Sequence, residues 1–211
     1  MFCTDRDLLA LEPNLFRDGG WSSQRLVSGT AAIAGTTLTV TAPDVEFDDA
    51  GIGEGHIALV DGTPCEVVER LSATTLTVSR PRASSADDPI PPAPVADKPL
   101  SIYTFAPQIA IVHRQLLAML GLGASGSGAD ITEDAITNTG DLTHLEALGA
   151  LHLIFATLAA PGGPWSDPAF TRMRLYQERF ASERAHTLAF IDTDGDGLPD
   201  AARRCNAFLT R

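Results

Sequence analysis

Hydrophobic and polar positions follow two different periods along the chain. Between residues 31 and 80, short runs of Thr, Val, Ile and Leu are separated by Gly and Asp, which is typical of strands joined by tight turns. The expected strands are 31–33, 36–41, 56–60, 65–71, 75–79 and, last, 101–105. Because so few strands bury little apolar surface as a flat sheet, the pattern predicts a small barrel of the SH3 type or a sandwich.

The second half carries apolar residues at helical spacing. Pro107 opens one helix, which we expect to end at Gly121 or Gly123. Asp141 opens a second, and Asp167 with Pro168 opens a third that runs towards Phe190. A further short helix is expected at the N-terminus, where residues 4–7 resemble a capping box. Together these segments predict a small helical bundle.

The predicted fold class is therefore α+β, with a small helical bundle and an inserted small β-barrel or β-sandwich module. Residues 1–30 form the N-terminal helix and its connection, assigned to the helical part, and residues 31–105 form the β-rich module. Residues 106–211 form the rest of the helical domain. Segment 81–99 is rich in proline, which favours extended geometry, so it marks a domain boundary or a long surface loop. Residues 124–128 have the composition of a flexible linker.

Composition excludes several classes of function. The chain has 211 residues with a formal net charge of −12, which repels a phosphate backbone and argues against general nucleic-acid binding. No apolar run approaches the roughly 18 residues of a membrane helix, so no membrane partner is expected. The three cysteines lie far apart without a CxxC spacing, which argues against a disulfide framework or a zinc knuckle and favours a reducing compartment.

The most specific local pattern is the acidic segment 192–200, Asp-Thr-Asp-Gly-Asp-Gly-Leu-Pro-Asp. A calcium loop needs carboxylates at positions one, three, five and nine, a glycine at six and a backbone carbonyl at seven. The matching residues are Asp192, Asp194, Asp196, Leu198 and Asp200. Position twelve is Arg203, where an EF-hand supplies a bidentate glutamate. Two interpretations stay open: a site for Ca²⁺ or another hard cation, and a plain acidic turn whose side chains satisfy local backbone donors.

The C-terminus is locally basic within an acidic protein, through Arg203, Arg204 and Arg211. These arginines are candidates for docking on an acidic partner, and a solvated end is the alternative. No HExxH, G-x-S-x-G or phosphate-binding loop is present, so we predict that the protein is not an enzyme and requires no cofactor. Finding a closed polar pocket with shifted acids would reopen the enzyme alternative.

The organisation as a whole resembles the head-tail adaptor proteins of tailed bacteriophages and prophages, also described as head completion or neck proteins. The resemblance spans most of the chain. The segments that carry it are residues 4–9 with Glu12 and Pro13, residues 56–60 with 71–79, and residues 176–180 running into 192–200. The β module departs from the smaller, all-helical adaptors.

The resemblance implies a structural virion protein of the neck, assembled in the bacterial cytoplasm. It implies a homo-oligomeric ring, usually a dodecamer, that lies between the portal protein and a tail or stopper protein. The helical part would contact the portal and neighbouring copies, and DNA would pass through the ring without sequence-specific binding. The alternative function, from the residues alone, is a calcium-dependent binding module centred on Asp192–Asp200.

Overall fold

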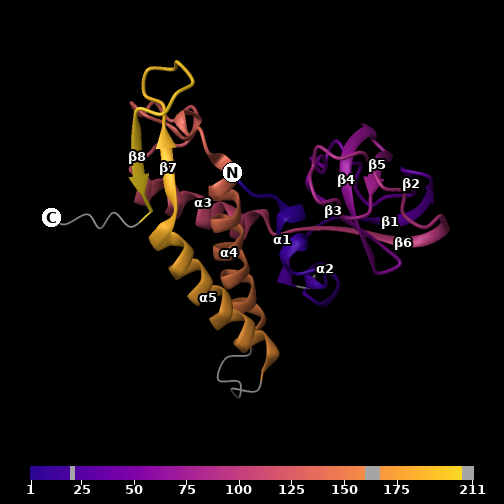
Figure 1. Cartoon of the computed structure of the whole chain (residues 1–211). Helices are drawn as coiled ribbons and strands as arrows, with labels where there is room; N and C mark the ends of the chain where they lie inside the picture. Colours follow the sequence, from indigo (N-terminus) through magenta and orange to yellow (C-terminus); the bar gives the residue numbers. More distant parts are fainter. Residues whose placement is uncertain (20–21, 160–166, 206–211) are drawn as a thin grey trace. The chain divides into compact units, whose positions relative to one another are not determined.

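The computed structural model describes residues 1–19, 22–159 and 167–205. The chain divides into two compact units, a barrel unit of Thr4–Phe105 and a helical unit of Met1–Cys3 with Ala106–Arg211 (Figure 1). The barrel unit is therefore inserted into the helical unit after its third residue. Each unit has its own hydrophobic core, so each is described by itself.

The barrel unit contains six antiparallel strands that close on themselves in the order β1-β2-β5-β4-β3-β6. Their bounds are β1 Gln24–Ala34, β2 Thr37–Thr41, β3 Ile57–Val60, β4 Thr63–Ser72, β5 Thr75–Ser79 and β6 Val95–Thr104. This closure selects the barrel over the sandwich. Asp61 and Gly62 both adopt positive φ, of 51° and 75°, and form the two-residue turn between β3 and β4.

Buried and exposed side chains alternate along the strands, which gives each strand one face for the barrel core. In β2, Leu38 and Val40 are buried while the threonines between them are not. In β5, Leu76 and Val78 are buried in the same way, and Leu38 lies directly opposite Leu76 in the register of the two strands. Residues 35–40 and 73–78 have nearly the same sequence, and they belong to these two neighbouring strands, each with one face in the barrel core.

The proline-rich segment is a loop of the barrel unit, and the boundary between the units follows Phe105. Strand β6 begins inside that segment, at Val95, and includes Pro99. Pro99 has no N–H to donate, but its carbonyl accepts the amide of Asp61 at 2.9 Å. The register between β1 and β6 shifts nearby, between Ala31 and Ile33. The last strand is consequently longer than residues 101–105.

Two short helices, α1 (Asp5–Leu11) and α2 (Leu15–Asp18), belong to the barrel unit. The sequence assigned residues 1–30 to the helical part, and here the structure differs. Leu8, Leu9 and Phe16 are buried, and Phe16 contacts the ring of Phe105 edge-on at 5.3 Å between centroids. The amide of Phe105 also donates to the carboxylate of Asp5 at 2.8 Å. These contacts hold α1 and α2 beside the end of β6.

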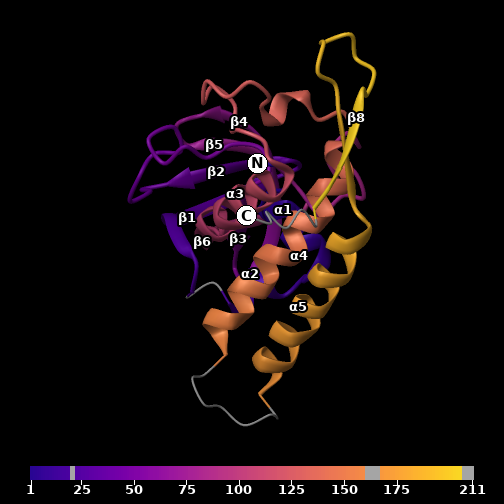
Figure 2. The ribbon, with the colours of Figure 1, turned by 90° about the vertical axis from the view of Figure 1, so that its left-hand side faces the viewer.

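The helical unit contains three long helices, α3 (Ala106–Leu120), α4 (Thr139–Leu158) and α5 (Pro168–His186). Helix α4 packs against both others, as two views show (Figures 1 and 2). A short 3-10 helix, η2 (Glu133–Ala135), lies between α3 and α4. Gly121 ends α3 with a φ of +66°, and the Asp167 side chain caps α5 by accepting from the amide of Ala169, both as predicted.

Two features of the helical unit were not predicted. Helix α5 ends at His186, and the chain continues as strand β7 (Leu188–Ile191), which pairs with β8 (Ala201–Arg204) in an antiparallel hairpin around the acidic segment. In addition, of the residues in α5 only Tyr176 is buried, although Phe170, Met173 and Phe180 follow the same helical spacing. Most of the surface of α5 is therefore not covered by the other residues that the structure describes.

Candidate functional site

The acidic segment 192–200 forms the loop at the end of the β7–β8 hairpin. Asp192 accepts the amides of Gly195 and Gly197 at 2.7 and 2.8 Å, one on each carboxylate oxygen. These two hydrogen bonds hold the pKa of the Asp192 carboxyl below its ordinary value. The Thr193 hydroxyl and amide both donate to Asp200, at 2.6 and 2.8 Å, and lower the pKa of that carboxyl. The carboxylates thus stabilise the turn itself.

The loop brings only part of the expected calcium ligand set together. Carboxylate oxygens of Asp192, Asp194 and Asp200 lie within 4.8 Å of one another. Asp196 is not part of this group, and its carboxylate accepts the amide of Leu198 at 2.7 Å. Ca²⁺ takes six to eight oxygen ligands. Three carboxylates fit part of that shell, so Asp192, Asp194 and Asp200 are the residues that could hold the ion.

Of the three basic residues at the end of the chain, Arg203 and Arg204 lie among the described residues, and their surroundings differ. The Arg203 guanidinium donates to the carbonyls of Leu120 and Gly121, at 2.8 and 2.9 Å, and so caps the C-terminal end of α3. This contact explains why position twelve of the loop does not face the carboxylates. Arg204 is exposed, and Arg211 lies outside the described residues.

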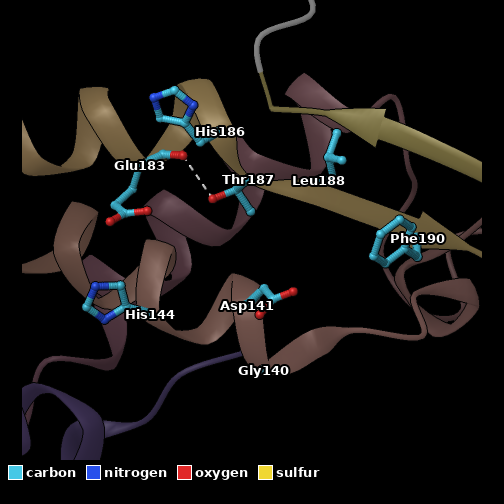
Figure 3. Close-up of a pocket in the computed structure, with 8 residues that line it drawn as sticks. All are labelled: Gly140, Asp141, His144, Glu183, His186, Thr187, Leu188 and Phe190. Carbon is cyan, nitrogen blue, oxygen red and sulfur yellow. Dashed lines mark hydrogen bonds between the residues drawn. The ribbon is translucent and has the colours of Figure 1, made fainter.

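A pocket of 440 Å³ lies where the start of α4, the end of α5 and the start of β7 meet (Figure 3). Its lining residues are Gly140, Asp141, His144, Glu183, His186, Thr187, Leu188 and Phe190. Asp141 accepts a hydrogen bond from the Asn138 side chain at 2.8 Å, and the Thr187 hydroxyl donates to the Glu183 carbonyl at 2.9 Å. The pocket combines an aromatic wall with two imidazoles and two carboxylates at the surface. The pocket is open to solvent.

A second hollow, of 320 Å³, lies on the exposed side of α5. The described residues that line it are Phe170, Thr171, Arg174, Leu175 and Glu178 of α5. Leu175 is 40% exposed, and Arg174 forms an exposed ion pair with Glu178 at 3.4 Å. The hollow therefore presents an apolar patch with a charged rim.

A buried polar network in the helical unit was missed at the sequence level. Glu146 is fully buried on α4, and its carboxylate accepts the amides of Phe2 and Cys3 at 2.7 and 2.6 Å and lies 2.8 Å from His113 Nδ1. His113 Nε2 lies 2.8 Å from Glu133. Burial opposes ionisation of Glu133, but the amide of Ser125 and the ring of His113 together hold the pKa of its carboxyl below the ordinary value. A glutamate within the apolar stripe of α4 is the signal that could have revealed this network.

The barrel unit contains a comparable buried network around Glu66, which is 0% exposed. Its carboxylate pairs with Arg6 at 3.2 Å and with both the guanidinium and the amide of Arg82. The guanidinium of Arg82 also donates to the Asp87 carbonyl, and that of Arg6 donates to the Arg82 carbonyl. These contacts fasten the proline-rich loop to β4, so they are structural.

Comparison of the chain with protein family models, with curated proteins and with solved structures found no match. Among the described residues, no helix combines the length and the apolar character that crossing a bilayer requires.

Proposed function

We propose that this protein is a structural component of a tailed bacteriophage or prophage particle, a head-tail adaptor of the virion neck. Identical copies form a ring, a dodecamer by resemblance to the family, between the portal protein and a tail or stopper protein. In this proposal α3, α4 and α5 act as a small bundle that contacts the portal and neighbouring copies, and other segments face the tail.

The observation that carries the proposal is the uncovered surface of α5. Of the 19 residues of α5, only Tyr176 is buried among the residues that the structure describes, and helices in proteins depend on packing of an apolar face. Phe170, Met173 and Phe180 are only partly covered, and Leu175 is exposed. Neighbouring copies in a ring would supply the missing cover.

The charge balance supports the same role. The chain has 15 basic against 27 acidic residues, and binding to a DNA backbone depends on Lys and Arg that displace counterions. A ring made of such chains would let the duplex pass without holding it. We therefore expect no measurable affinity for duplex DNA at physiological ionic strength.

Assembly tests the proposal directly. The purified protein, alone and mixed with the portal protein of the same particle, is to be measured by light scattering after size exclusion and imaged in negative stain. The proposal expects closed rings, or copies seated on portal rings. A protein that stays monomeric in both conditions contradicts it.

A calcium-dependent binding module is the second candidate, favoured by the convergence of Asp192, Asp194 and Asp200. Calorimetric titration with CaCl₂ tests it, together with the melting temperature at saturating Ca²⁺. Binding that disappears in Asp192→Asn, with a rise in melting temperature in the wild type, supports this candidate. Indifference to Ca²⁺ shows that the loop is a turn held by its own backbone hydrogen bonds.

A further inference from the structure

We propose that one proton fastens the loop between α3 and α4 onto α3, because His113 is held as an imidazolium between two glutamates. This proton latch consists of His113 on α3, Glu146 on α4 and Glu133 on the 3-10 helix η2. All three residues belong to the helical unit. The inference concerns a single copy of the chain, so it does not depend on the proposed assembly.

Both ring nitrogens of His113 face a carboxylate. Nδ1 lies 2.8 Å from Glu146 Oε1, and Nε2 lies 2.8 Å from Glu133 Oε2. A neutral imidazole has one N–H and one lone pair, so it can donate to only one of these two oxygens. The other carboxylate would face the lone pair and be repelled. The geometry therefore requires one proton more than a neutral ring between two carboxylates would carry.

The additional proton belongs on the ring rather than on a carboxyl group. A free imidazole binds a proton roughly 100-fold more tightly than a free glutamate carboxylate does. Oε2 of Glu146 accepts the amides of Phe2 and Cys3, an arrangement that suits a carboxylate. Burial raises the pKa of the Glu133 carboxyl, but the amide of Ser125 and the charge of His113 outweigh burial and hold that pKa below its ordinary value. His113 is thus a positive charge between two negative ones.

Loss of the proton would release Glu133 rather than Glu146. The Glu146 side chain is 0% exposed and has three donors around it, whereas the Glu133 side chain is 15% exposed. The remaining ring proton therefore stays with Glu146, and the Glu133 carboxylate turns away from the lone pair at Nε2. The ammonium of Met1 also lies 3.8 Å from Glu133, but it is 45% exposed and holds the carboxylate only weakly.

Glu133 organises the loop that the latch holds. Its Oε1 accepts the amide and the hydroxyl of Ser125, at 3.0 and 3.2 Å, and its own amide donates to the Gly123 carbonyl at 2.9 Å. The contact of its Oε2 with His113 connects these residues to α3. Release of Glu133 would therefore loosen residues 123–135 from α3, while the contact between His113 and Glu146 keeps α3 and α4 together.

The latch is strongest at low pH. The folded state holds the ring proton more tightly than the unfolded chain, in which the two glutamates are not fixed beside the ring. The stabilisation is consequently complete below about pH 6.5, where a free imidazole is protonated, and is lost as the pH rises above that value. One proton linked in this way lowers the equilibrium constant for folding by up to about tenfold per pH unit.

Nuclear magnetic resonance of the protein labelled with ¹⁵N-histidine tests the charge directly. At pH 7.5, where about 90% of a free imidazole is neutral, both ring nitrogens of His113 are expected to carry protons. The signals are assigned by replacing the other four histidines with glutamine, one at a time. When the ring loses its proton at higher pH, the backbone resonances of residues 123–135 are expected to shift together with it. A single protonated nitrogen at pH 7.5, or loop resonances that do not follow the ring, overturns the latch.

A substitution at Glu133 provides a second test. Glu133→Gln removes the need for the additional proton, because an amide group can pair with either form of the ring. Urea unfolding between pH 6 and 9 should show the wild type losing stability with rising pH more steeply than Glu133→Gln does. The matched control is Asp134→Asn, because Asp134 is the exposed neighbouring acid and accepts the hydroxyls of Ser125 and Thr132. This control should keep the wild-type slope, and equal slopes for wild type and Glu133→Gln overturn the proposal. If Glu133→Gln does not fold, the resonance experiment on the wild type decides.

Discussion

Replacing Glu146 with alanine tests whether the buried network holds the helical unit together. The carboxylate of Glu146 is 0% exposed and accepts the amides of Phe2 and Cys3 while contacting His113. Alanine would leave these three groups without that partner in the interior. The Phe2 ring also contacts the His113 ring in a tilted arrangement, at 4.8 Å between centroids, so loss of the carboxylate would release that contact as well.

The expected loss of stability follows from these contacts. Each buried donor left without a partner destabilises the folded variant by about 1–3 kcal/mol. This loss is partly offset, because the variant no longer has to bury a carboxylate. The net loss is therefore about 3–5 kcal/mol, as for removal of one member of a buried polar pair. For a chain of this length the melting temperature falls by roughly 2–4 °C per kcal/mol, so a decrease of roughly 6–20 °C is expected.

Thermal unfolding followed by circular dichroism measures this decrease. Glu178→Ala is the matched control, because Glu178 lies on α5 in an exposed ion pair and its removal should change the free energy of unfolding by less than about 1 kcal/mol. A double-mutant cycle with His113→Ala isolates the coupling between the two side chains. If Glu146→Ala and Glu178→Ala melt alike, the network contributes no stability and the reasoning is refuted.

Three further predictions concern buried titratable groups. Burial raises the pKa of the Asp5 carboxyl to about 6, against the opposing hydrogen bonds from Thr104 and Phe105, so the folded state retains this proton more strongly than the unfolded state. Protonated Asp5 therefore stabilises the folded state at about pH 4, and this contribution to the free energy of unfolding is lost as the pH rises to 6. Between pH 4 and 7, urea titrations of the wild type and of Asp5→Asn should diverge in that window by up to about 3 kcal/mol in the free energy of unfolding. Burial also raises the pKa of the Cys65 thiol to about 11 and that of Cys205 above its ordinary value, so at pH 8 a thiol reagent should modify no cysteine rapidly in the native protein and all three after denaturation. Arg82→Ala leaves the Glu66 carboxylate with one guanidinium fewer and should destabilise the barrel unit by about 3–5 kcal/mol, whereas Glu66→Gln with Arg82→Met should lose less, as thermal unfolding of both variants would show.

The sequence predicts the parts of the fold that local chemistry determines. Alternation at Leu38 and Leu76 marks two one-sided strands, and Asp167 with Pro168 marks the start of α5 because capping acts within one turn. The sequence did not decide between a barrel and a sandwich, because closure of the barrel depends on β6 pairing with both β1 and β3. Pro99 concealed the start of that strand, because a proline normally argues against a ladder.

For the candidate sites too, the sequence reveals local patterns but not contacts between distant residues. Residues 192–200 form a loop in which three of the expected carboxylates lie close together, and their spacing is visible locally in the sequence. The hairpin that carries the loop was missed because β7 has only four residues and follows α5 with no intervening glycine or proline. The network around Glu146 joins residues more than a hundred positions apart. Helical spacing groups Phe170 and Phe180 with Tyr176, yet both phenylalanines are only partly buried, because spacing does not determine how completely a neighbouring element covers a face.

Two passages of chain join the units, at Cys3–Thr4 and at Phe105–Ala106. In the helical unit, the Glu146 carboxylate accepts the amides of Phe2 and Cys3, which directly precede the first passage. In the barrel unit, the carboxylate of Asp5, next to the first passage, accepts the amide of Phe105 at the second passage. The chain thus passes between the units twice, and a buried carboxylate holds the backbone at each passage. Cleavage of the backbone at one passage would therefore leave the two units covalently connected through the other.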